Sequence, residues 1–124
     1  MYDDSEPSLR PALSDKKKRD NSVHRENREV RQAASAITAA ISAHTLMLAR
    51  YRALAGYHRD DERALVIDGC RGITSAVGRV RQNLSDLRKT LPDRLQQHSR
   101  LVDLDRALDA LEAGADDVLD KIAG

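Results

Sequence analysis

The chain has 124 residues, which is room for one domain and a tail, and its 21 Lys and Arg nearly cancel its 20 Asp and Glu. That balance argues against a polybasic protein whose whole surface binds nucleic acid. Three Tyr without Phe or Trp are too few aromatics for a β-sandwich or barrel, and the single Cys70 rules out an internal disulfide framework or a thiolate zinc cluster. We therefore expect a soluble helical protein of a reducing compartment.

The first 21 residues have the composition of a disordered tail. Two of the three prolines fall here, and a basic cluster follows at Lys16–Arg19. Too little apolar surface is present to offset the entropy lost on ordering. The tail lacks the apolar segment of a signal peptide, and the uncharged stretch 33–49 is too rich in Ala, Ser and Thr to span a bilayer. The sequence therefore predicts a cytoplasmic protein without membrane contact; in a eukaryotic cell the cluster would also suit nuclear import.

Apolar residues recur at heptad spacing from about residue 22 to residue 55. Three neighbouring columns make up the pattern: Val30, Ile37, His44 and Tyr51; Ala34, Ile41 and Leu48; and Ala33, Ala40, Met47 and Leu54. A face of three columns is wider than the seam of a two-stranded coiled coil and suits a helix bundle. Gly56 supplies a natural end to this helix.

A second helix is predicted over residues 60–91. It opens on three acidic residues, where the helix dipole favours negative charge. Two heptad columns follow: Val66, Ile73, Val80 and Leu87; and Cys70, Val77, Leu84 and Leu91. Gly69, Gly72 and Gly78 interrupt the helix, and a break near Gly69 is one interpretation. We prefer one continuous helix, because the heptad phase runs through the glycines, which would then allow close approach of a neighbour.

Residues 92–123 carry the sharpest pattern in the chain. Pro92 suits a first helical turn, and apolar residues then alternate by three and four, as coiled-coil core positions do. Short connections force neighbouring helices to run in opposite directions. The sequence thus predicts an all-α fold: an elongated, antiparallel, coiled-coil-like three-helix bundle of residues 22–124 behind the tail 1–21.

The widths of the apolar faces suggest a function. The third helix has a narrow seam suited to one partner, while the first has a face broad enough for two or more. This mismatch indicates a surface left for another chain, and we expect a non-enzymatic interaction or assembly protein that binds copies of itself or a larger complex. The residues expected to mediate binding are Ile37, Ile41, Leu48, Tyr51 and Leu54 on one helix, and Leu101, Leu104, Leu108, Leu111, Val118 and Ile122 on the other.

Charge changes sign along the chain, from net +4 over residues 1–59 to −4 over 92–124. The favoured explanation is that basic side chains of the first helix face the acidic third helix within one bundle. The alternative is a nucleic-acid-associated accessory protein, whose sequence-independent phosphate contacts would weaken with salt. Its candidate residues are Lys16, Lys17, Lys18, Arg19, Arg25, Arg28 and Arg31.

Catalytic and cofactor chemistry has little support. Residues 43–46 (Ala-His-Thr-Leu) resemble the phospho-acceptor site of histidine phosphotransfer domains, which are helical bundles and would make His44 the phosphorylated residue. That family continues with Lys and Gly, where this chain has Met47 and Leu48, so we favour a core or interface histidine. No nucleophile elbow, phosphate loop or metal-binding histidine pattern is present, and we expect no enzyme, cofactor or metal. Cys70 falls in a core column and should be an inert thiol.

Overall fold

The computed structural model describes residues 21–57 and 60–123, and these residues contain helices and turns without a strand. A helical segment at 21–33 precedes α2 (Ser35–Leu54), α3 (Asp60–Thr90) and α4 (Ser99–Ala123). Short 3-10 turns, η2 (Ala55–Tyr57) and η3 (Asp93–Leu95), lie between the long helices. The all-helical prediction is confirmed, but four helices are found where three were predicted. Of the predicted tail 1–21, residues 1–20 lie outside the described residues and Asn21 begins the helical segment.

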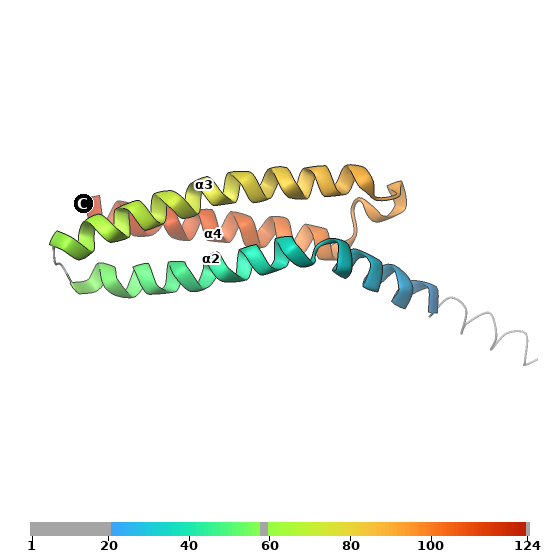
Figure 1. Cartoon of the computed structure of the whole chain (residues 1–124), viewed down its shortest axis with the longest axis horizontal. Coiled ribbons are helices and arrows are strands. Elements are labelled where there is room, and N and C mark those ends of the chain that lie inside the picture. The colour runs from blue at the N-terminus through green and yellow to red at the C-terminus, as the bar shows by residue number, and fades with distance from the viewer. Residues whose placement is uncertain (1–20, 58–59, 124) are drawn as a thin grey trace, which may run out of the picture.

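Helices α2, α3 and α4 lie side by side and contact one another pairwise, with their connections at opposite ends of the bundle (Figure 1). One apolar core runs between them, to which α2 contributes Ile37, Ile41 and Leu48. The best-buried large side chains come from α3, α4, η3 and segment 21–33. They include Val30, Val66, Ile73, Leu84, Leu95, Leu101, Leu108 and Val118. Heptad spacing places these side chains on one side of each helix, which is why burial follows the sequence pattern.

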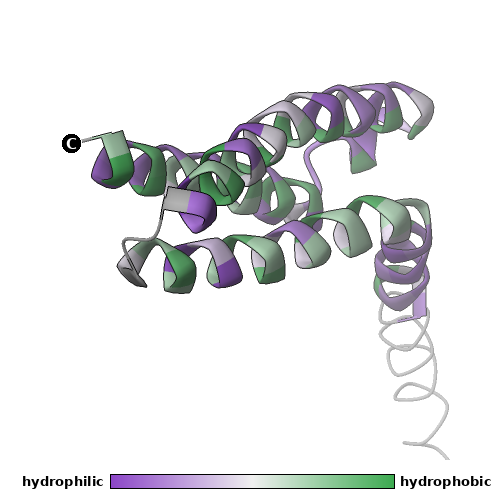
Figure 2. Ribbon diagram, turned by 60° about the vertical axis from the view of Figure 1, so that its left-hand side comes forward, coloured by the Kyte–Doolittle hydropathy of each residue, from purple (hydrophilic) through white to green (hydrophobic). Residues whose placement is uncertain are grey.

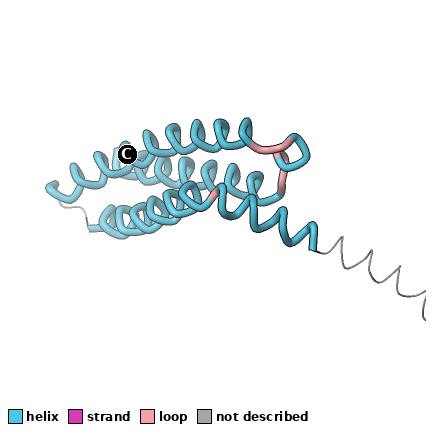
Figure 3. Tube along the Cα trace, turned by 45° about the vertical axis from the view of Figure 1, so that its right-hand side comes forward, coloured by secondary structure: helices cyan, strands magenta, loops and turns pink. Residues whose placement is uncertain are grey.

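The predicted first helix is broken at Ala34. Its backbone there has φ −94° and ψ 5°, and the chain direction changes between segment 21–33 and α2 (Figure 3). The carbonyl of Ala34 accepts both the backbone N–H and the side-chain hydroxyl of Thr38, at 2.9 and 3.0 Å. Hydroxyl back-bonding of this kind often accompanies a bend, although Thr45 and Thr74 make the same bond within α2 and α3 without a break. Because Val30 and Ala34 both remain buried, the heptad pattern continues through the break and could not reveal it.

Helix α3 runs without interruption through its glycines. Gly69 is the position where a neighbour comes closest, because a Cβ at residue 69 would overlap the ring carbons of Tyr51 in α2. Gly114 of α4 similarly lies against Leu48 of α2, where an added Cβ would be 2.7 Å from Leu48 Cδ2. These two glycines allow α2 to pack closely on both neighbours.

The third predicted helix, 92–123, begins later than expected. Pro92 precedes the η3 turn, which carries Leu95 into the core, and α4 follows only at Ser99. The side chain of His98 caps the start of α4, because its Nδ1 accepts a hydrogen bond from the backbone N–H of Arg100 at 3.1 Å. The other ring nitrogen, Nε2, donates to Asn27 Oδ1 at 2.8 Å and so connects this end of the bundle to segment 21–33.

Ion pairs connect α3 with α4 rather than the first helix with the last. Arg81 binds Asp109 at 2.6 Å and Glu112 at 2.7 Å, and Arg88 binds Asp105. These carboxylates raise the pKa of Arg81. Among the described residues no ion pair joins the first helix to α4, although the guanidinium of Arg52 in α2 lies beside Gly114 of α4. The arginines that pair with α4 carboxylates belong to α3.

Candidate interaction surface

The residues of both predicted binding seams lie in the hydrophobic core of this chain. Within the α2 seam, Ile37, Ile41 and Leu48 are buried. Within the α4 seam, the buried residues are Leu101, Leu104, Leu108, Leu111 and Val118. The remaining three, Tyr51, Leu54 and Ile122, are half-buried against the same core. The structure therefore brings the two seams together as the core of one chain, and a docking surface must be sought elsewhere.

The outward side of α2 is unusually apolar for a surface helix. No charged residue falls between Arg31 and Arg50. The α2 outer face, which we define by the exposed apolar residues turned away from α3 and α4, consists of Ala36, Ala39, Ala43, Leu46, Ala49 and Ala53. The polar residues Ser35, Ser42 and Arg50 are exposed among them. Leu46 is 69% exposed. In Figure 2 α2 is coloured pale to green along most of its length, whereas segment 21–33 is largely purple. A surface helix usually carries charged residues on its outward side, and α2 has none there before Arg50.

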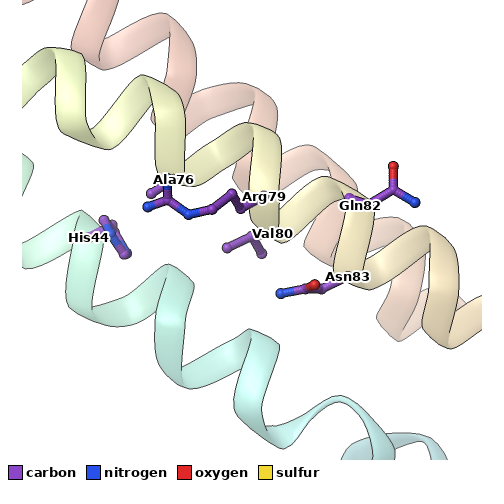
Figure 4. Close-up of a pocket in the computed structure, with 6 residues that line it drawn as sticks. All are labelled: His44, Ala76, Arg79, Val80, Gln82 and Asn83. Carbon is purple, nitrogen blue, oxygen red and sulfur yellow. The ribbon is translucent and has the colours of Figure 1, made fainter.

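A shallow hollow of about 330 Å³ lies between α2 and α3. His44 points into it from α2, opposite Ala76, Arg79 and Val80 of α3 (Figure 4), and Gln82 and Asn83 complete its lining. His44 Nδ1 lies 2.7 Å from the carbonyl oxygen of Ala40, so this nitrogen carries the proton and donates it. The other ring nitrogen, Nε2, takes no part in that hydrogen bond. None of the lining residues is a carboxylate.

The α3 side of this hollow continues as a row of residues at helical spacing. Gly69 touches Tyr51 and Ala76 lines the hollow, and Gly72 lies between them on the same side of the helix. One turn before Gly69 is Leu65, which is 53% exposed. Neither Leu46 nor Leu65 was among the residues predicted to bind a partner. The sequence signal for Leu46 is the uncharged stretch 33–49.

The candidate phosphate-binding residues fall into two groups. Lys16, Lys17, Lys18 and Arg19 lie outside the described residues. Arg25, Arg28 and Arg31 are exposed on segment 21–33, three residues apart, and none forms an ion pair with another described residue. Glu26 and Glu29 alternate with them, and Glu26 binds Arg94 at 3.2 Å.

Other reactive groups in the described residues are buried or isolated. Cys70 is fully buried, and burial raises the pKa of its thiol, against a weaker opposing effect of the Arg52 charge. No cluster of three or more His, Cys, Asp or Glu side chains is placed to hold a metal ion within the described ranges. The helices of 21–57 and 60–123 also include none with the length and hydropathy needed to cross a bilayer.

The chain was compared with protein-family models, with curated proteins and with solved structures. None of these three comparisons gives a match.

Proposed function

We propose that the protein is a non-enzymatic helical interaction protein, which binds partner proteins by helix packing on the α2 outer face. In this proposal α2, α3 and α4 form an antiparallel three-helix core that displays this face. The observation that carries the proposal is Leu46, 69% exposed within the uncharged stretch between Arg31 and Arg50, on a helix whose inner side is already buried. Exposed apolar surface of this kind is typical of protein-binding sites.

The composition of the face supports a helical partner. Alanine side chains let two helix backbones approach closely, and a central leucine can fill a gap between side chains on the neighbouring helix. Arg31 and Arg50 flank the uncharged stretch, at either end. They favour a partner helix with acidic residues near its ends.

The test is co-purification of the tagged full chain from its own cells, followed by mass spectrometry. Leu46→Asp should remove a stoichiometric protein partner, while Ala110→Asp, on the exposed side of α4, should retain it. Because both positions are exposed, the helical content should not change. Equal recovery with wild type and Leu46→Asp would refute binding through this face.

A second candidate function, sequence-independent binding of nucleic acid, is favoured by the three exposed arginines of segment 21–33. It predicts that partners disappear on nuclease treatment. It also predicts that replacing Arg25, Arg28 and Arg31 by Gln lowers affinity for any duplex and reduces its salt dependence. A partner that survives nuclease and depends on Leu46 would reject this alternative.

A further inference from the structure

Apolar side chains and an unfilled hollow lie on the same side of the bundle, where α2 borders α3. Met47 of α2 is 39% exposed and Leu65 of α3 is 53% exposed. The hollow between His44, Ala76 and Val80 has a volume of about 330 Å³. Within the described residues about half of the surface of Leu65 is left uncovered, close to the hollow in sequence position along α3.

The residues of α3 on this side are spaced symmetrically about Gly72. Leu65 precedes Gly72 by seven residues and Arg79 follows it by seven. Asp68 precedes it by four and Ala76 follows it by four. Seven and four residues are close to two turns and one turn of helix, so all of them share one side. A second α3, related to the first by a 180° rotation about an axis through Gly72, would therefore place its Leu65 opposite Arg79 of the first copy.

We propose that a second copy of this chain docks on the α2–α3 side, with the two α3 helices antiparallel and the two-fold axis at Gly72. Leu65 of each copy enters the hollow of the other, between Ala76 and Val80. Arg79 of each copy meets Asp61 and Asp68 of the other. This proposal rests on the proposed function, since it names one partner of the interaction protein.

Charge complementarity supports a second copy over another occupant. Arg79, Asp61 and Asp68 are exposed, and none forms an ion pair with any other described residue. In the antiparallel arrangement Arg79 comes level with Leu65, and the two aspartates lie about 5 Å to either side along the helix axis. A symmetric interface makes each of these pairs twice.

Gly72 supplies the space that the axis requires. A Cβ at residue 72 would meet nothing within 4 Å, so packing within the chain does not require glycine there. A glycine inside a helix costs about 1 kcal/mol relative to alanine. At the two-fold axis, its missing side chain would let the two α3 backbones approach closely.

The size of the face predicts a dimer of moderate strength. The α3 segment 61–83 is roughly 33 Å long, so the face is about one helix wide, with only the C-terminal half of α2 beside it. Stable interfaces typically bury about 800 Å² per partner. We therefore expect a dimer that dissociates on dilution and weakens with salt.

The test is sedimentation equilibrium of the full chain, from low micromolar to several hundred micromolar concentration. We expect a monomer–dimer equilibrium in which Leu65→Asp or Arg79→Glu raises the dissociation constant by roughly tenfold or more. The triple variant Asp61→Arg, Asp68→Arg, Arg79→Glu should restore dimerisation, because it exchanges the charges on both sides. Leu46→Asp, on the other side of α2, should dimerise like wild type. Circular dichroism should show unchanged helical content throughout.

The outcomes separate this proposal from the proposed function. A wild-type chain that stays monomeric over the whole range would overturn the dimer, and so would a dimer insensitive to Leu65→Asp. Failure of the triple variant to recover would overturn the Arg79 pairing that orients the copies. If the wild type is monomeric but still loses a protein partner through Leu46→Asp, the dimer is wrong and the proposed function stands. A dimer with the expected variant pattern, but without a Leu46-dependent partner, supports the dimer and rejects the docking role of the α2 outer face.

Discussion

The ring of Tyr51 in α2 lies against Gly69 in α3 so closely that any side chain at residue 69 would overlap it. The half-buried ring occupies the space that a Cβ would take. This contact sets the distance between the two helices at the end of the bundle nearest η2. It explains why α3 keeps a glycine at a position where alanine would favour the helix by about 1 kcal/mol.

Gly69→Ala should therefore destabilise the protein by about 1–3 kcal/mol, because the ring must move or the helices must separate. Gly78→Ala is the matched control, since a Cβ at residue 78 would meet nothing within 4 Å. It should stabilise the fold by about 0.5–1 kcal/mol through helix propensity. Thermal unfolding followed by circular dichroism measures both. Melting temperatures that shift in the same direction would contradict the Tyr51 contact.

Much of this architecture follows from the spacing of apolar residues. The columns through Ile73 in α3 and Leu108 in α4 predicted both the helices and their buried sides. Periodicity could not predict the break at Ala34, because the residues on either side keep the heptad phase and both Val30 and Ala34 are buried. It also missed the η3 turn, in which Pro92 begins a connection that buries Leu95 rather than starting α4.

The candidate surface was harder to predict from the sequence than the core. An apolar residue on a helix looks the same in sequence whether it faces its own neighbours or another chain. Leu46 became distinct only when Leu48, two residues later, was found buried and Leu46 was not. The hollow beside His44 depends on how far apart α2 and α3 lie, which no single helix encodes.

Core and surface leucines should respond differently to the same truncation. Leu108 is fully buried, so Leu108→Ala removes apolar contacts and leaves a cavity, at a cost of about 2–5 kcal/mol. Leu46→Ala, at a 69% exposed position, should change stability by less than about 0.5 kcal/mol. Urea unfolding of the two variants at equal protein concentration provides the comparison. Comparable losses would mean that Leu46 is covered in solution.

The ion pairs of Arg81 should contribute modestly and depend on salt. Arg81 bridges Asp109 and Glu112, but its side chain is 37% exposed, so solvent screens both pairs. We expect Arg81→Met to cost about 1 kcal/mol at low ionic strength, and less in molar salt. Arg106→Met is the control, since Arg106 is exposed on α4 and forms no ion pair with the described residues. If the cost for Arg81→Met does not depend on salt, its alkyl chain rather than its charge is what stabilises the fold.

Cys70 should make stability fall at alkaline pH. Burial raises the pKa of its thiol above the ordinary value of 9.0, so the unfolded chain loses this proton more easily than the folded one. The resulting stabilisation is fully present below about pH 9 and is lost as pH rises through the raised pKa. Between about pH 8 and pH 10, the free energy of unfolding should decline more steeply for wild type than for Cys70→Ala. Other titrating groups contribute equally to both chains, so the difference in slope isolates the thiol. A native thiol that reacts readily with a thiol reagent at neutral pH would contradict the burial from which this prediction follows.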